Sequence, residues 1–187
     1  MKKKIICGIL GLAIVLLGIY ITLIYSSGKT EETARKVQKK QSSNYVVSNE
    51  ELSRAAKVIG EIKDEQTLNH KMMEMLFQKL TFDNDNFKVP NVLHPKRIQM
   101  TKENIQYLKN NLDIINDDDE KNEYKSILNK WYNGDFKSVV EDFKKLRYLL
   151  WGDKALTPAK KTDKDEKEYI LHFFGQEGLD IHNKQWK

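Results

Sequence analysis

The feature that most constrains this chain is an uncharged, apolar run of 21 residues near its amino terminus, Ile5–Tyr25. As a helix rising about 1.5 Å per residue, such a run spans the roughly 30 Å hydrocarbon core of a bilayer. A cleaved signal peptide is the alternative, but its apolar region is only about 7 to 15 residues long and ends at a small-residue cleavage site. This run ends in "LIYSSG". The sequence therefore predicts an uncleaved, single-pass transmembrane anchor at residues 5–25.

Positive charge is concentrated beside this anchor. Residues 1–44 hold eight Lys/Arg and two Asp/Glu, so their net charge is +6. The whole chain has a formal net charge of +5, so the remaining residues have a net charge of −1. A near-neutral remainder lacks the basic face that nucleic-acid binding requires, so we expect no nucleic-acid partner. The lysines of the 1–4 tail have no acidic neighbour and favour a cytoplasmic amino terminus, although basic residues after the anchor nearly balance them. We expect a cell-membrane protein whose domain lies outside the cytoplasm.

The anchor also contains small residues on one face. Taken as a helix, it places Gly8, Gly11, Gly18 and Thr22 within an arc of roughly 80°. Such a face lets two membrane helices approach closely, so a homodimer formed through the anchor is one alternative and an unpaired glycine-rich anchor is the other. Cys7, also in this run, is the only cysteine, which excludes an intramolecular disulfide.

The rest of the chain is predicted to be a basic polar linker at residues 26–47 and an all-α domain at residues 48–187. Ser48 and Glu51 have the spacing of a capping box, and Thr101 is a second cap before an apolar helical period. Residues 81–100 have no sustained period and form a long loop. We expect five or six helices, at 48–63, 64–80, 101–115, 117–132, 135–151 and 164–175, followed by a frayed tail at 176–187.

The segment "KWYNGDFKSVVEDFKKLRYLLWG", residues 130–152, predicts a helical hairpin. Gly134 can end the first helix in the left-handed conformation, and Asp135 can cap the second. The turn is typical of tetratricopeptide repeats, but those repeat about every 34 residues and the pattern does not recur at that distance. The sequence therefore predicts one αα-hairpin and no repeat array.

Catalytic and metal-binding motifs are missing from the sequence. The four histidines, His70, His94, His172 and His182, include no HExxH motif and no pair four residues apart. There is also no GxSxG, phosphate loop or GxGxxG. We therefore expect no catalytic residue, no cofactor and no metal. An envelope-associated hydrolase that uses His70 or His94 is the alternative.

Three positions are candidates for binding a partner. His94 lies in the long loop, Asp135 lies in the hairpin turn, and Trp151 lies at the open end of the hairpin's second helix. Long loops are often functional, and tryptophan is enriched at interface hot spots, although it also fills small helical cores. We expect a protein-binding or regulatory module that contacts another envelope protein. A structural protein that dimerises through its anchor remains a further alternative.

Several motifs also resemble a known family. They are "NHKMMEMLFQKL", "MTKENIQ", "YKSILNKWYNGDF", the Trp151–Gly152 pair and "EKEYI", and together they span Asn69 to Ile170. The family consists of uncharacterised membrane-anchored proteins of Bacillus-type, Gram-positive bacteria and is known as a domain of unknown function. The resemblance implies anchoring and an envelope location but no activity. The family pattern has histidines near the places where this chain has Phe77 and Phe143, which argues against a shared metal or acid–base role.

Overall fold

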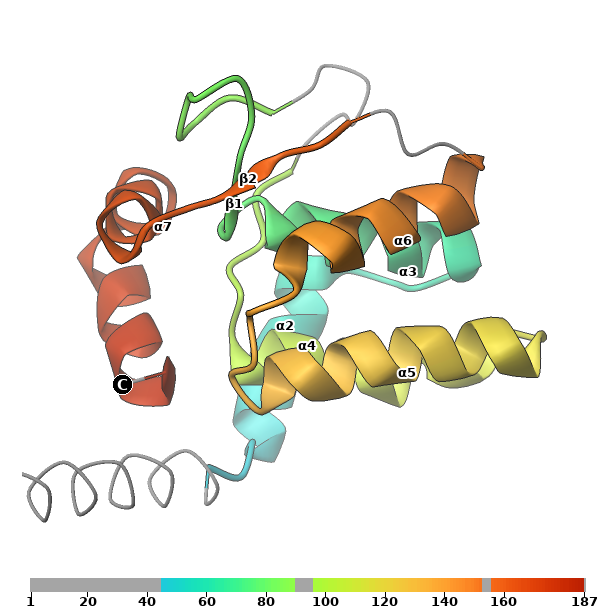
Figure 1. Ribbon diagram of the computed structural model, residues 1–187. Helices are drawn as coiled ribbons and strands as arrows, with labels where there is room; N and C mark the ends of the chain where they lie inside the picture. Colours follow the sequence, from blue (N-terminus) through green and yellow to red (C-terminus); the bar gives the residue numbers. More distant parts are fainter. Residues whose placement is uncertain (1–44, 90–95, 153–155, 187) are drawn as a thin grey trace, which may run out of the picture. The chain divides into compact units, whose positions relative to one another are not determined.

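The computed structural model describes residues 45–89, 96–152 and 156–186, and these residues are mostly helical (Figure 1). The α-helices are α2 (Asn49–Ile59), α3 (Glu65–Leu76), α4 (Lys102–Asn110), α5 (Asp118–Tyr132), α6 (Val139–Trp151) and α7 (Asp163–Trp186). A short 3-10 helix, η2 (Leu112–Ile114), and two short strands, β1 (Leu80–Thr81) and β2 (Ala159–Lys160), complete the secondary structure of this part. The helical prediction is confirmed, and the small sheet was not expected.

The expected anchor at residues 5–25, with its small-residue face, lies outside the described residues, as does most of the linker. Within the part that the structure describes, no helix is both long and apolar enough to cross a membrane.

Two helices, α2 and α4, begin where their predicted capping residues place them. Ser48 Oγ accepts a hydrogen bond from Glu51 N at 3.2 Å, and Glu51 Oε2 accepts one from Ser48 N at 2.9 Å, which completes the capping box. Thr101 caps α4, and Asp117 Oδ1 accepts from the first turn of α5. The predicted ends are less accurate. α2 stops at Ile59 and not at residue 63, because Gly60 adopts a φ of 83° that few other residues tolerate.

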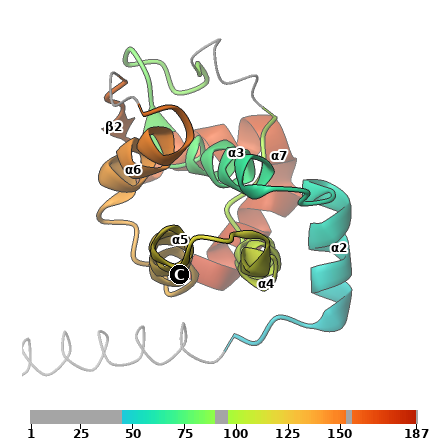
Figure 2. The same ribbon diagram turned by 90° about the vertical axis from the view of Figure 1, so that its right-hand side faces the viewer.

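The helices pack as two layers. α3 lies beside α6, and α4 lies beside α5, as both views show (Figures 1 and 2). The core between the layers includes Met72, Leu76, Ile105, Leu128, Trp131 and Phe143, all buried. Met73 and Met75 of α3 belong to the same core. This packing is the source of the fold's stability, because each helix buries one apolar face.

The hairpin forms at Gly134, but its second helix begins later than predicted. α6 starts at Val139, and Asp135 does not cap it; instead, Asp135 Oδ1 accepts a hydrogen bond from Lys137 N at 3.3 Å within the turn. Residues 135–138 are held outside the helix because Phe136 packs edge-on against Trp186 of α7, with ring centres 5.1 Å apart.

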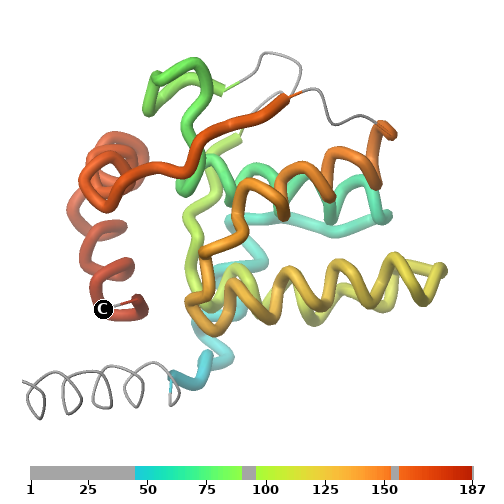
Figure 3. Tube along the Cα trace, viewed as in Figure 1, coloured from blue at the N-terminus to red at the C-terminus, as the bar shows by residue number. Residues whose placement is uncertain are grey.

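The prediction of a frayed tail at residues 176–187 is wrong. α7 continues to Trp186, with a kink at Gly175, where φ is 66°. Its second half lies along the segment that leads into α4 (Figure 3). There Gln99 Nε2 donates to Gly178 O at 2.6 Å, Lys102 N donates to Gln185 Oε1 at 2.7 Å, and Trp186 Nε1 donates to Met100 O at 3.1 Å. The polar sequence of residues 176–187 gives no apolar period, so these tertiary contacts could not be predicted from it.

The small sheet joins the end of α3 to the start of α7. β1 and β2 are antiparallel, with Leu80 opposite Lys160, and Lys161 N donates to Lys79 O at 2.8 Å. The buried ammonium of Lys161 also donates to Phe77 O at 2.8 Å and to Leu80 O. The carbonyls at a helix carboxyl end carry negative partial charge, which offsets part of the cost of burying this cation. This junction places Lys79 against the first turns of α7.

Candidate binding cleft

An inner cavity lies where α3, the hairpin turn and both halves of α7 meet, and its volume is about 190 Å³. It is lined by Lys79, Gly134, Phe136, Asp163, Glu166, Lys167, His182 and Trp186. Four of these residues carry full charges, and a histidine lies beside them, so the cavity is unlike a packing defect in an apolar core. Concave sites with convergent polar groups are the usual places for ligands.

The innermost charged groups are a buried lysine and a buried glutamate. Lys79 is 4% exposed and Glu166 is 8% exposed, and Lys79 Nζ lies 2.6 Å from Glu166 Oε1. Desolvation lowers the pKa of Lys79, and the charge of Glu166 partly opposes this shift. A buried ion pair seldom stabilises a fold more than apolar side chains of similar volume would. Such a pair at a cavity is therefore a functional-site candidate.

Two further side chains converge on the same carboxylate. Gln78 is fully buried; its Nε2 donates to Glu166 Oε1 at 2.7 Å, while its Oε1 accepts from Met100 N at 2.9 Å. His182 Nδ1 lies 3.7 Å from Glu166 Oε1. Lys79, Gln78 and His182 thus all approach the same oxygen, Glu166 Oε1, and the four side chains form a polar network linking the end of α3, α7 and the segment before α4.

Aromatic rings form one wall of the cavity. The Phe136 ring faces Lys79 Nζ, which lies 3.8 Å from the ring centre, a cation–π contact. Phe136 in turn packs against Trp186, whose ring would lie 3.6 Å from a Cβ on Gly134. Gly134 has a φ of 73°, so this turn favours glycine for its backbone conformation and brings the chain close to the indole.

The inner cavity continues into an outer cleft of about 370 Å³. The outer cleft shares Lys79, Gly134, Phe136, Asp163 and Glu166 with the cavity and adds Asn133, Asp135, Lys137 and Lys160. The added residues are exposed. The outer cleft is therefore the entrance through which solvent or a ligand reaches the buried pair.

A shallow groove along the outer face of α5 extends this entrance. Its volume is about 580 Å³, and it is lined by Asn122, Lys125, Ser126, Asn129, Lys130, Asn133 and Asp135. Asn133 and Asp135 line both the groove and the outer cleft. We call the cavity, the outer cleft and the groove together the trough. It leads from the buried Lys79–Glu166 pair to the surface of α5.

The trough is rich in lysine. Its lining includes Lys79, Lys125, Lys130, Lys137, Lys160 and Lys167 but only three acidic residues, Asp135, Asp163 and Glu166. Two of these lysines are paired, Lys79 with Glu166 and Lys130 with Asp142. Residues 45–187 have a net charge of only −1, so the trough is a local concentration of positive charge on a near-neutral domain.

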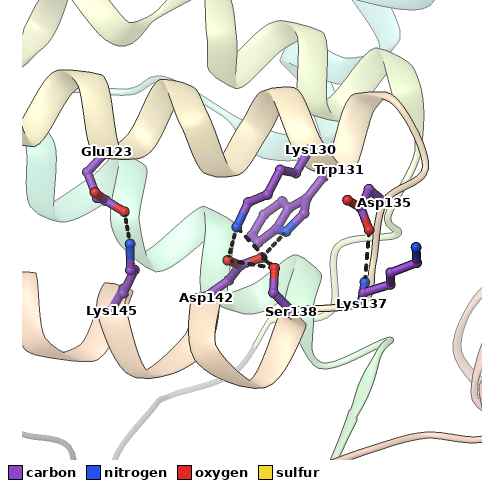
Figure 4. Close-up of polar contacts among 8 residues, drawn as sticks. All are labelled: Glu123, Lys130, Trp131, Asp135, Lys137, Ser138, Asp142 and Lys145. Atoms are coloured by element: carbon purple, nitrogen blue, oxygen red, sulfur yellow. Dashed lines mark hydrogen bonds and ion pairs between the residues drawn. The ribbon is translucent and has the colours of Figure 1, made fainter.

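The carboxylate of Asp142 connects the two helices of the hairpin, α5 and α6 (Figure 4). Its carboxylate is 1% exposed, accepts a hydrogen bond from Trp131 Nε1 at 2.9 Å, and contacts the ammonium of Lys130. Ser138 Oγ lies 3.4 Å from the same carboxylate. Asp142 thereby joins the end of α5 to the start of α6 and holds the turn that carries Asp135 and Phe136.

The residues that the sequence suggested do not gather in one place. Asp135 lines the trough, whereas Trp151 lies at the other end of α6, where it is 41% exposed and packs edge-on against His70 at 5.7 Å between ring centres. The guanidinium of Arg147 stacks on the same indole at 5.0 Å. His94 lies outside the described residues. Among the residues described, no group of His, Cys, Asp and Glu side chains could hold a metal ion.

Sequence reasoning missed Lys79, Glu166, His182 and Trp186. They come from distant parts of the chain, and no motif joins them. One local signal exists: Lys79 follows Met72 and Leu76 at helical spacing, and Glu166 precedes Tyr169 and Ile170 in the same way. A charged residue in register with an apolar face is a sign of a buried polar site.

Comparison with known families finds a match over part of this chain. Residues 88–171 match the model of a family of unknown function, DUF6241. The match covers α4, the hairpin, β2 and the first turns of α7, and it overlaps the region where the sequence resembles a domain of unknown function. No curated protein and no solved structure matches the chain.

Proposed function

We propose that this protein is a membrane-anchored, extracytoplasmic module that binds another protein of the cell envelope through the trough, without catalysing a reaction. The single observation that carries the proposal is the continuity of the trough. The inner cavity with its buried charge pair shares residues with the outer cleft, and the cleft shares residues with the groove along α5. An elongated depression of this kind suits an extended segment of a partner better than a compact cofactor.

The sequence supports the membrane part of the proposal. The uncharged run at 5–25 is long enough to span a bilayer, and the leading lysines favour a cytoplasmic amino terminus. A tether then presents the domain near the membrane surface, where envelope proteins are concentrated. Tethering raises the effective concentration of two proteins that share a membrane, so even a weak interface can be functional.

Co-purification after crosslinking tests this proposal. The full-length chain is crosslinked in intact membranes, solubilised and purified, and the captured proteins are compared with those captured by the variant Lys137→Glu/Lys160→Glu. Both lysines are exposed and line the trough. We expect a defined partner with the wild-type chain and at least about a tenfold loss with the variant, because like charges across an interface cost several kcal/mol.

The matched control is Arg54→Glu/Lys57→Glu, which makes the same change of charge on the exposed face of α2. It should capture the partner as well as the wild-type chain does. If both variants behave alike, or if no specific protein is captured, the trough is not the binding surface. Circular dichroism confirms that each variant remains helical.

A further inference from the structure

We infer that the partner inserts an acidic side chain into the inner cavity, where its carboxylate accepts a hydrogen bond from Lys79. This inference rests on the proposed function and adds the chemistry of what the trough recognises. It follows from four observations: the donors of Lys79, the size of the cavity, the state of Glu166, and the charges at the entrance.

The ammonium of Lys79 has more hydrogen-bond donors than the described residues accept. A lysine ammonium carries three N–H groups. One is directed to Glu166 Oε1 at 2.6 Å, and the Phe136 ring faces the nitrogen at 3.8 Å. Among the described residues no other acceptor contacts Nζ, so at least one donor remains for a guest in the cavity. Lys79 is 4% exposed, and a buried donor needs an acceptor.

The size of the cavity suits a single side chain. Pockets for whole small-molecule ligands usually measure about 300 to 1,000 Å³, whereas the inner cavity measures about 190 Å³. That volume accommodates the carboxylate and methylenes of one aspartate or glutamate, with Phe136 and Trp186 against the methylenes. The outer cleft and the groove then hold the backbone that carries this side chain.

The charges favour an anionic guest over a cationic one. Glu166 Oε1 already accepts from Lys79 and Gln78, so the negative charge of Glu166, at the base of the cavity, is balanced by the Lys79 ammonium. The exposed lysines Lys137 and Lys160 and the half-exposed Lys167 line the trough and have no ion pair with a described residue. Two acids in the same lining, Asp135 and Asp163, oppose an anion there. The lysines outnumber these acids.

Fluorine NMR of the full chain in detergent micelles tests the inference. The chain has three tryptophans, so labelling with 5-fluorotryptophan gives three resonances. Trp186 lines the cavity, Trp131 is buried in the hairpin, and Trp151 lies at the other end of α6. The probes are an acetylated, amidated hexapeptide with one central glutamate, the same peptide with glutamine, and sodium propionate.

We expect the glutamate peptide to shift the Trp186 resonance saturably while the Trp131 and Trp151 resonances stay in place, and we expect no shift with the glutamine peptide. Lys79→Met should weaken binding by about 30-fold or more, because truncating one partner of a buried charge pair has an effect of this size. Lys71→Met is the matched control, since the Lys71 side chain on α3 is also mostly buried and paired with a glutamate, Glu74, but does not line the trough. Lys167→Gln changes a half-exposed residue that lines the cavity, so this variant should also weaken binding and should leave the fold intact.

Equal shifts with both peptides, or no shift with either, would overturn the inference. Propionate binding as tightly as the glutamate peptide would also overturn it, because the site would then recognise a free carboxylate and not a partner's segment. If the glutamate peptide does not bind, but the crosslinking experiment still captures a partner that depends on Lys137 and Lys160, the insertion of an acidic side chain is refuted. The proposed function, binding of an envelope protein through the trough, would then still hold.

Discussion

Asp142 and Glu123 both contact lysines across the α5–α6 hairpin, but their surroundings differ (Figure 4). Asp142 is almost completely buried and accepts from the indole of Trp131, whereas the side chains of Glu123 and Lys145 are 38% and 53% exposed. At the scale of the residue, burial decides what a carboxylate contributes. A surface pair is screened by water, and a buried carboxylate cannot be removed without leaving its donors unsatisfied.

We therefore predict that Asp142→Ala lowers the free energy of unfolding by about 3 kcal/mol, because it leaves the buried Trp131 N–H without an acceptor and removes the partner of Lys130. Glu123→Ala is the control on the same hairpin and should change it by less than about 1 kcal/mol. Urea unfolding followed by circular dichroism measures both. Equal effects would mean that Asp142 does not hold the turn.

Lys161 gives the fold a pH dependence. Desolvation lowers the pKa of Lys161 to about 8, while the unfolded chain keeps the ordinary value of 10.5. Between these values the unfolded state binds the proton and the folded state does not, so the free energy of unfolding rises with pH from about 8 toward 10.

Tyr45 has the opposite effect at higher pH. Burial raises the pKa of Tyr45 to about 12, so the folded state retains a proton that the unfolded state loses above about pH 10. The free energy of unfolding therefore falls above about pH 10.

The expected result is a maximum in the free energy of unfolding near pH 10, with a rise from pH 8 of up to about 3 kcal/mol. Lys161→Met should flatten much of this rise, although the pKa of Lys79 and that of Lys102 are also lowered by desolvation. Urea unfolding at a series of pH values tests this. A wild-type stability that falls steadily above pH 8 would contradict the account of Lys161.

At the scale of the element, α7 shows what the sequence could and could not predict. Caps and apolar periods identified most helix starts, because Ser48, Thr101 and Asp117 act through local hydrogen bonds. The tail after Gly175 was expected to fray because its sequence is polar. Its helix is held by tertiary partners at residues 99–102, far away in the sequence.

The trough was unpredictable for the same reason. Lys79, Glu166 and His182 meet only because β1 pairs with β2 and α7 bends at Gly175. Asp135 alone was suggested in advance, because the "NGDF" turn is a local signal. Local chemistry therefore predicted the hairpin, and long-range packing created the site.

We predict that Trp186→Ala lowers the free energy of unfolding by about 2 kcal/mol, since the indole is partly buried against Phe136 and donates to Met100 O. The loss should be local. Hydrogen exchange of residues 176–186 should quicken, while exchange in α3 and α5 stays slow. If the tail exchanges rapidly in the wild-type chain, the packing of α7 described here is wrong.

At the scale of the whole molecule, we propose that the uncharged run and the folded domain have separate roles. The chain divides into one unit at Met1–Asn44 and another at Tyr45–Lys187. We predict that the full chain stays in the membrane fraction after alkaline carbonate extraction and that a chain lacking residues 1–28 does not. Protease added to intact cells should cleave the domain, and resistance in intact but not lysed cells would place it in the cytoplasm.

The measurement that tests the central claim most directly is site-specific photocrosslinking in living cells, with a photoreactive residue placed at Asn129, at Lys137 or at Arg54. The first two lie in the trough on α5 and in the hairpin turn, and Arg54 lies on the exposed face of α2. We predict that the same protein is captured from Asn129 and Lys137 and is not captured from Arg54. Capture from all three positions, or from Arg54 alone, would contradict the assignment of the trough as the binding site.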